Sequence, residues 1–207
     1  MNKAFKVLVL VGVLSTGLMG CVGNTTKVQS QIDYAKFSQQ QMPLSNDLSE
    51  EDEYQFALDL ARFQVKHQKY REAEVLLQKL RKVKPEEIDI YRLLAKSYEG
   101  QKQSETALVA WKQVVKLPNA SVDDEAELAR LAIMLSEYPL AESVYQGWLK
   151  SKNISTRVSG LNNLGFSALL QKDVSVARSY FQSALQEDPL NSKAMNNLKL
   201  IKGFEEE

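Results

Sequence analysis

The stretch LNNLGFSALLQKDVSVARSYFQSALQEDPLN, residues 161–191, has two apolar segments on either side of the polar turn QKDV. Gly165 lies in the first segment, and Ala177 and Phe181 lie in the second. The second segment ends near Pro189, a residue that cannot continue a helix. The stretch therefore predicts two helices of about a dozen residues each, joined by a short turn.

The same pattern occurs three more times upstream. Alanines mark its register at intervals of 34, 34 and 36 residues: Ala73, Ala107, Ala141 and Ala177. Twelve residues before each alanine, a small residue follows a leucine: Ala61, Ala95, Ala129 and Gly165. Four residues after each alanine lies a large apolar residue: Leu77, Trp111, Tyr145 and Phe181. Self-similarity at a fixed period is typical of repeat architectures.

These positions resemble the tetratricopeptide repeat, a unit of about 34 residues made of two antiparallel helices. The resemblance implies an all-α, right-handed superhelix of about four helix-turn-helix units within a domain spanning 49–203. The units are expected near residues 54–87, 88–121, 122–155 and 158–191, with turns at HQKY, GQKQ, SEYP and QKDV. A C-terminal capping helix is expected at 192–203, followed by an acidic tail at 204–207.

The third unit departs from the family pattern at two positions. Glu125 stands where the family usually has a bulky apolar residue, and Trp148 stands where it usually has a small one. The unit also ends without a proline, whereas Pro85 closes the first unit. These departures bear on the packing at the third junction and not on the repeat itself.

The N-terminus has the layout of a secretory signal. Lys3 and Lys6 precede an apolar run, VLVLVGVL, at residues 7–14. The run is shorter than the roughly 18–20 apolar residues that a bilayer-spanning helix needs, so we do not expect a permanent span.

The residues that follow, Leu-Met-Gly-Cys at 18–21, resemble the bacterial lipobox, in which the cysteine is diacylated and then becomes the first residue. Cys21 is the only cysteine in the chain, and a thiolate is nucleophilic enough to accept a diacylglyceryl group. The resemblance predicts a signal peptide at 1–20, lipidation of Cys21 and attachment to a membrane through two or three acyl chains. The alternatives are an ordinary signal peptide with an incidental cysteine, or a buried internal cysteine.

Residues 21–48 are rich in Gln, Ser, Asn and Thr, and they predict a lipidated flexible tether. Ile32, Tyr34 and Phe37 could instead dock on the repeats or form one short helix. Val22 stands where inner-membrane retention signals commonly place Asp. Similarity to Gram-negative lipoproteins therefore implies an outer-membrane location, facing the periplasm.

The chemistry available in the sequence favours a non-enzyme. The 26 Lys and Arg balance the 26 Asp and Glu, so no global field attracts nucleic acid. The single histidine, His67, is expected in a solvated turn. No phosphate loop, metal-ligand cluster or Ser-His-Asp set can be assembled, and we expect neither a cofactor nor a metal.

The inner wall of such a superhelix is lined by the first helix of each unit, and it is where we expect binding. The family's inward positions imply a peptide-binding groove at Arg62, Lys66, Arg92, Lys96, Arg130, Asn162 and Phe166. The basic residues suit an acidic or carboxylate-bearing part of a peptide, and the apolar fourth unit suits an anchor side chain. The sequence leaves a second interpretation open, in which the bases pair with Asp89, Glu99 and Asp123 or are solvated.

A lipobox, a short tether and about four repeats resemble the TadD family of the tight-adherence (Flp) pilus system, and next the PilF and PilW pilotins of type IV pili. The resemblance implies an adaptor that binds a secretin subunit or other pilus assembly proteins and helps the secretin reach or assemble in the outer membrane. An NlpI-like periplasmic adaptor that scaffolds cell-wall hydrolases or proteases is the alternative. The oligomeric state stays open, since exposed apolar residues on the end helices could cap the superhelix or pair two copies.

Overall fold

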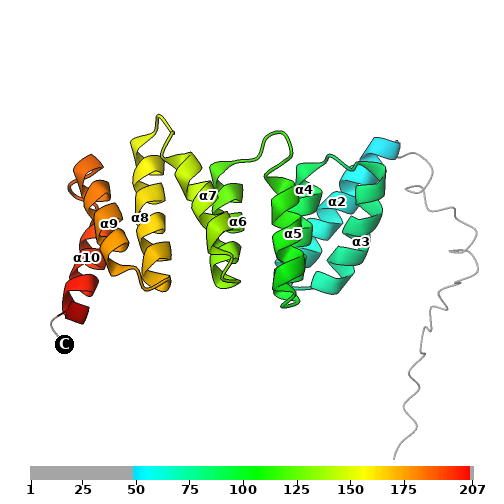
Figure 1. The fold of residues 1–207 in the computed structure, drawn as a ribbon. Helices are drawn as coiled ribbons and strands as arrows, with labels where there is room; N and C mark the ends of the chain where they lie inside the picture. The colour runs from blue at the N-terminus through cyan, green and yellow to red at the C-terminus, as the bar shows by residue number, and fades with distance from the viewer. Residues whose placement is uncertain (1–48, 206–207) are drawn as a thin grey trace, which may run out of the picture. The chain divides into compact units, whose positions relative to one another are not determined.

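The computed structural model describes residues 49–205. The predicted signal peptide, Cys21 and the tether lie outside the described residues, as does the end of the predicted acidic tail. In the part described, all regular structure is helical (Figure 1). The helices are α2 (Glu50–Lys66), α3 (Tyr70–Val83), α4 (Ile88–Gly100), α5 (Ser104–Val114), α6 (Val122–Met134), α7 (Tyr138–Trp148), α8 (Ile154–Leu170), α9 (Val174–Glu187) and α10 (Ser192–Glu205).

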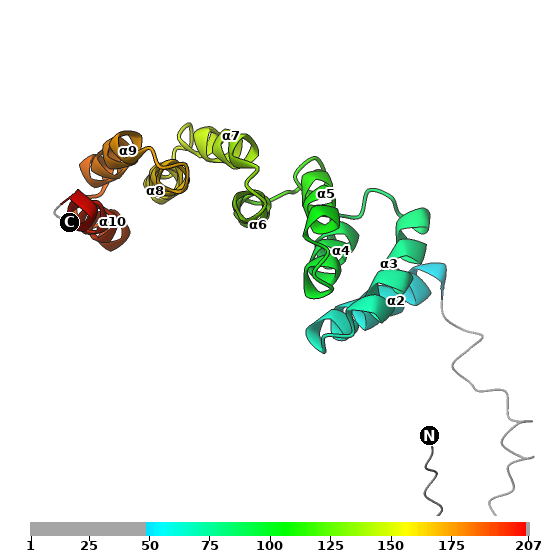
Figure 2. The ribbon, with the colours of Figure 1, turned by 60° about the horizontal axis from the view of Figure 1, so that its bottom comes forward.

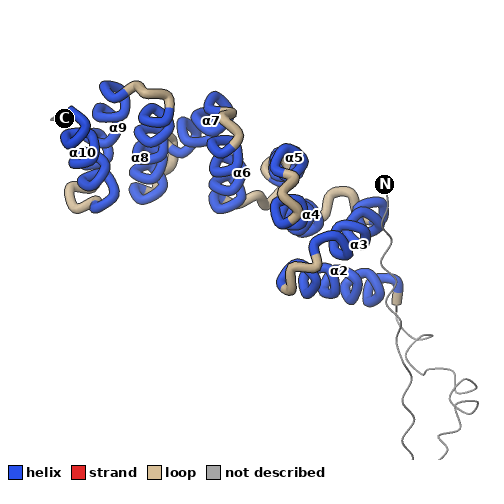
Figure 3. The backbone as a smooth tube through the Cα atoms, turned by 90° about the horizontal axis from the view of Figure 1, so that it is seen from below, coloured by secondary structure: helices blue, strands red, loops and turns tan. Residues whose placement is uncertain are grey.

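Consecutive helices pair side by side, and the pairs stack in chain order. Figure 2 shows two rows, which we call the inner row (α2, α4, α6, α8 and α10) and the outer row (α3, α5, α7 and α9). Figure 3 shows that only short loops join the helices. The prediction of an all-α superhelix with about four helix pairs and a C-terminal capping helix is confirmed. No helix within 49–205 is long and apolar enough to cross a bilayer.

Local sequence signals explain where the inner helices begin. The Ser49 hydroxyl accepts the Asp52 backbone N–H at 3.2 Å, and the Asp52 carboxylate accepts the Ser49 backbone N–H at 3.4 Å. Ser121 and Asp124 form the same capping box at the start of α6. Such reciprocal bonds satisfy donors that the first helical turn leaves open.

Each turn from an inner to an outer helix contains one residue in the left-handed conformation. These residues are Gln68, Lys102, Ser136 and Lys172, with φ of 60°, 62°, 61° and 66°. The next residue closes the turn; for example, the Gln103 N–H donates to the Tyr98 carbonyl at 2.9 Å. This is the Schellman geometry of a helix C-terminus, usually built on glycine. The four residues share the register of the repeat alanines, so every unit turns in the same way.

The core of each unit packs a small residue of the inner helix close to a large one of the outer helix. In the fourth unit, Gly165 on α8 faces the ring of Phe181 on α9, and Phe181 is fully buried. In the first unit, the residues at these positions, Ala61 and Leu77, are also fully buried. The small residues let paired helices approach closely, which is the role that the repeat pattern predicts for them.

The two departures in the third unit compensate each other. The Trp148 indole N–H donates to the Glu125 carboxylate at 2.6 Å. The Trp148 side chain is buried, and the bond gives its polar edge a partner, as a buried indole requires. The polar residue at 125 therefore accommodates the large residue at 148.

Candidate functional site

The predicted groove residues all lie on the inner row. Helix α2 carries Arg62 and Lys66, and α4 carries Arg92 and Lys96. Arg130 lies on α6, and α8 carries Asn162 and Phe166. The inner row thus places these residues along one side of the stack, from α2 to α8, but the structure gives them different environments.

The arginines of the first two units form one chain of ion pairs across α2, α4 and α6. Arg62 pairs with Asp59 of its own helix at 2.6 Å and with Asp89 on α4. Asp89 also accepts from Arg92 at 2.9 Å. Arg92 then reaches Asp124 on α6 through two nitrogens, Nε at 2.8 Å and Nη2 at 2.6 Å. Bidentate pairing of this kind is the strongest geometry for a guanidinium and a carboxylate.

The Arg92–Asp124 pair is the most buried link of this chain. The Asp124 side chain is only 7% exposed. The hydrogen bond from Arg92 outweighs the effect of burial and lowers the pKa of Asp124 to about 2. The same bond raises the pKa of Arg92. For Asp89, burial raises the pKa, but the bonds from Arg62 and Arg92 outweigh it and the net shift is downward.

Arg130 is also engaged. It pairs with Glu99 on α4 and, at 2.7 Å, with Glu127 of its own helix. The second oxygen of Glu99 accepts the Trp111 indole N–H at 2.8 Å. One carboxylate therefore links α4, α5 and α6.

Of the two interpretations that the sequence left open, the structure shows ion pairing for the three arginines. Asp89 and Glu99 accept as anticipated, but the α6 carboxylate that binds Arg92 is Asp124 and not Asp123. Asp124 was missed, because its capping-box spacing from Ser121 predicts only that it caps α6.

The two lysines differ from the arginines. Lys66 and Lys96 are exposed and make no ion pair with any residue in 49–205. Lys96 borders a shallow pocket of about 360 Å³ together with Val65, Tyr70 and Trp111. On the inner helices of the first two units, the ammonium groups of Lys66 and Lys96 are therefore the positive charges without an ion-pair partner in 49–205.

A larger groove, of about 820 Å³, lies between α6, α8 and α10. Its lining comes mainly from the N-terminal parts of these helices and from the loop before α10, and includes Val122, Asp123, Ala126, Ile154, Ser159, Asn162, Asn163, Asp188 and Asn191. Val122 and Ile154 are exposed apolar residues at this groove. The lining therefore combines apolar contacts with several amide and hydroxyl groups and with the carboxylates of Asp123 and Asp188.

Asn162 is the buried polar group of the groove, with 6% of its surface exposed. Its Nδ2 donates to the Val158 carbonyl at 3.1 Å and to Asn191 Oδ1 at 3.1 Å. Its Oδ1 is buried and has no hydrogen-bond partner. Phe166 lies one helical turn further along the same side of α8 and is exposed.

Several groove residues were absent from the sequence-based prediction. Asn191 directly precedes the capping helix α10, where its Oδ1 also accepts the Ala194 N–H at 3.1 Å, and Ile154 begins α8. Both come from junctions between units. The only detectable signal was Asn191 directly after the DPL turn, a position typical of a helix N-cap.

The described residues show no sign of a metal centre. No group of His, Cys, Asp and Glu side chains within 49–205 is arranged to hold a metal ion. His67 is an exposed residue at the end of α2, and the centroid of its ring lies 4.1 Å from the centroid of the Phe63 ring.

Comparison with known proteins gives structural but not sequence relatives. No protein-family model matches this sequence, and no curated protein matches it either. A tetratricopeptide repeat protein from Parabacteroides merdae superimposes with a TM-score of 0.60 at 16% identity, over 72% of this chain and 59% of its own. PilF of Pseudomonas aeruginosa gives 0.56 at 15% identity, over 74% of this chain and 69% of its own. YrrB, a TPR protein with an unusual peptide-binding site, gives a TM-score of 0.54 at 15% identity, over 72% of this chain and 76% of its own.

Identities this low bear on the fold alone. The stacked helix pairs, their inner and outer rows, and these structural likenesses show that residues 49–205 have the tetratricopeptide-repeat fold.

Proposed function

We propose that this protein is a non-enzymatic, lipid-anchored adaptor that binds an extended segment of a partner protein in the groove between α6, α8 and α10. One observation carries the proposal. Asn162 lines a groove of about 820 Å³, and its buried Oδ1 has no hydrogen-bond partner. A buried acceptor left unpaired costs roughly 1–3 kcal/mol, so a ligand that moves the covering side chains aside and donates to it is favoured.

An extended peptide offers what this groove lacks. It carries a free backbone N–H that can donate to Asn162 Oδ1, and side chains that can contact Ile154 and Val122. Phe166 and Lys96 extend the surface along the inner row with an exposed ring and a free ammonium. The peptide-binding site of YrrB, a protein of the same fold, supports this use of the architecture.

The partner we propose is an outer-membrane secretin subunit of a tight-adherence or type IV pilus system. The lipobox at 18–21 supports a periplasm-facing lipid anchor at the outer membrane, and the structural likeness to PilF supports the pilus context. The acyl chains would hold the adaptor at the membrane where the secretin assembles.

Crosslinking of the lipidated protein in membranes, followed by pull-down, tests the partner and the groove together. Ile154→Asp places a charge in the groove at a residue that is 54% exposed, so the fold should tolerate it. Val109→Asp is the matched control, because Val109 is 66% exposed but lies on α5 in the outer row. We expect wild type and the control to recover a secretin and Ile154→Asp to lose it. Recovery of cell-wall hydrolases without a secretin would favour the NlpI-like alternative, and unchanged recovery with Ile154→Asp would refute the groove.

The role of Asn162 is tested with a peptide from the recovered partner. Asn162→Ala removes the unpaired acceptor, and we expect the peptide to bind about tenfold more weakly. Asn196→Ala, at an exposed position on α10, should leave the affinity unchanged. Equal affinities for both variants by titration calorimetry would contradict the proposed hydrogen bond. Thermal melts of both proteins report whether the repeats stay folded.

The anchor is tested separately at Cys21. We expect Cys21→Ser to abolish incorporation of radioactive fatty acid and to leave the helical circular dichroism of the repeats unchanged. A Cys21→Ser protein that is still processed and labelled would refute lipidation at this residue.

A further inference from the structure

The N-terminal end of the repeat stack carries an apolar stripe. Phe56, Leu60 and Phe63 on α2 are 68%, 39% and 54% exposed. Their spacing of four and three residues places them on one side of the helix. Leu58 and Ala61, on the opposite side, are buried in the core. Within 49–205 the His67 ring lies against Phe63, and the three side chains otherwise stay open to solvent. We call this surface the α2 stripe.

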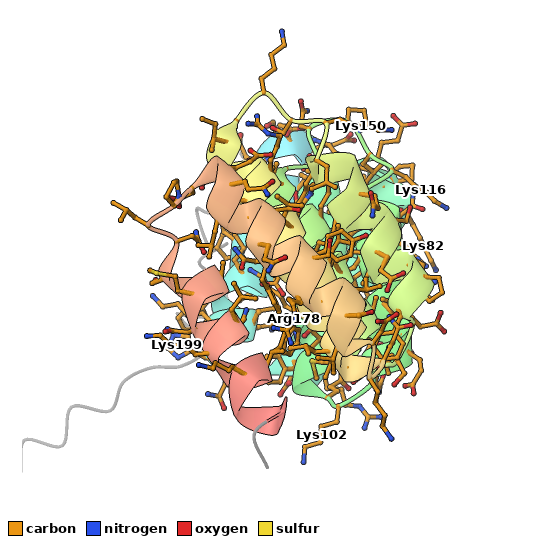
Figure 4. All side chains as sticks on the ribbon, turned by 60° about the vertical axis from the view of Figure 1, so that its left-hand side comes forward. Lys82, Lys102, Lys116, Lys150, Arg178 and Lys199 are labelled. Atoms are coloured by element: carbon orange, nitrogen blue, oxygen red, sulfur yellow. The ribbon has the colours of Figure 1, made fainter. Side chains whose placement is uncertain are left out.

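The other end of the stack differs. On α10 the exposed Met195 and Leu200 are interrupted by Asn196 and Lys199, which are also exposed. Figure 4 shows the Lys199 side chain projecting away from the repeats. A polar outer face is what the terminal repeat of a solenoid needs in water. The α2 end lacks it, which indicates that the stripe is built to be covered.

The charges around the stripe are arranged in opposite signs. The first turn of α2 is acidic, and the last turn ends in Lys66. Glu53 and Lys66 are exposed and make no ion pair with any residue in 49–205. An acidic start, an apolar centre and a basic end are complementary to the same helix running in the opposite direction.

We propose that the α2 stripe binds a second copy of this chain, with the two α2 helices packed antiparallel about a two-fold axis near Leu60. In this register Phe56 of each copy meets Phe63 of the other. Glu53 lies level with Lys66 of the other copy, and a crossing angle between the two helices brings these two charges together. A two-fold interface of this kind uses the same patch twice and closes on itself. Antiparallel packing also sets each helix N-terminus beside the oppositely charged C-terminus of the other copy.

The centre of the interface satisfies one further electrostatic requirement. Asp59 is the neighbour of Leu60, so the two copies bring their Asp59 side chains near the axis. Arg62 of the same helix binds Asp59 at 2.6 Å, which compensates its charge. Two carboxylates therefore do not face each other unpaired.

Cysteine crosslinking in the full-length protein tests the geometry. Leu60→Cys lies at the axis, and mild oxidation of membranes should link it into a disulfide dimer. Val109→Cys, on α5, is at a more exposed position (66% against 39% for Leu60) and should not link. A head-to-tail contact between α2 and α10 would instead link a Leu60→Cys, Lys199→Cys double variant into a ladder of higher oligomers, and that result would overturn the proposal.

Charge reversal tests the pairing. We expect Glu53→Lys and Lys66→Glu each to weaken self-association about tenfold, measured by co-purification of two differently tagged full-length copies. The double variant should associate like wild type, because both pairs re-form with their signs exchanged. Phe56→Asp should abolish co-purification. Two results would show that a second copy does not cover the stripe. One is single charge reversals that leave self-association unchanged. The other is a Leu60→Cys variant that does not crosslink, together with a monomeric mass for the wild-type protein.

Discussion

Replacing Gly165 by alanine tests whether close helix contact in the fourth unit depends on a missing methyl group. A Cβ added at Gly165 would lie 2.6 Å from Phe181 Cε1 and 2.8 Å from its Cζ. Real Cβ atoms essentially never make contacts this short. The Phe181 ring is fully buried, and protein interiors are close-packed. We therefore expect Gly165→Ala to overpack the interface between α8 and α9.

Two opposing effects set the magnitude. Overpacking a core typically costs about 1–3 kcal/mol. Alanine in a helix is favoured over glycine by up to about 1 kcal/mol. Gly147 on α7 separates the two effects, because a Cβ there would have no neighbour within 4 Å. The difference between Gly165→Ala and Gly147→Ala should therefore equal the overpacking cost, about 1–3 kcal/mol in the free energy of unfolding.

Urea denaturation followed by circular dichroism measures these free energies. A third protein combines Gly165→Ala with Phe181→Leu and so reproduces the Ala61–Leu77 pair of the first unit. We expect the double variant to be more stable than the sum of the two single changes predicts, because the smaller side chain accommodates the methyl group. Equal effects of Gly165→Ala and Gly147→Ala, within about 0.5 kcal/mol, would refute the reasoning.

Two further predictions concern charge and backbone. Since the folded-state pKa of Asp124 is lowered to about 2 by Arg92, its ion pair stabilises the fold by about 2 kcal/mol above pH 5, and this contribution is lost as the pH falls towards 2. Asp124→Asn should therefore be less stable at pH 7 and lose less stability between pH 7 and pH 3 in urea titrations; an unchanged pH dependence would contradict the pairing. Ser136→Gly, at a φ of 61°, should raise the free energy of unfolding by up to about 1 kcal/mol. Ser143→Gly, on the exposed side of α7, should lower it by a similar amount, and two changes of the same sign would exclude the backbone explanation.

The fold could be predicted because its determinants are local and recur. Each unit needs a small residue, a large one and a turn in the same register, and the sequence shows these features four times. The left-handed turn residues were missed, because Gln68, Lys102, Ser136 and Lys172 share no chemistry. Their spacing alone carries the signal.

The candidate site was predicted less completely, because its contacts join different units. Asp123 and Asp124 are neighbours at the start of one helix, and a rotation of about 100° separates their side chains. Which one meets Arg92 depends on how α6 packs against α4. The Trp148–Glu125 bond has the same origin, since it joins two apparent exceptions that lie 23 residues apart. A residue-by-residue comparison with the repeat pattern cannot show that two departures compensate.

The ion pairs change what the inner wall can offer a ligand. Arg62, Arg92 and Arg130 already bind carboxylates of neighbouring helices, so an acidic peptide would have to displace those partners. Displacement is least favourable at Arg92, because it would leave the buried Asp124 charge unpaired. The groove between α6, α8 and α10 has the opposite character, with an acceptor that still lacks a donor. The first half of the wall therefore holds its helices together, while the second half remains open for binding. Since the α2 stripe lies at the far end of the stack from α10, association through it would leave that groove accessible in both copies.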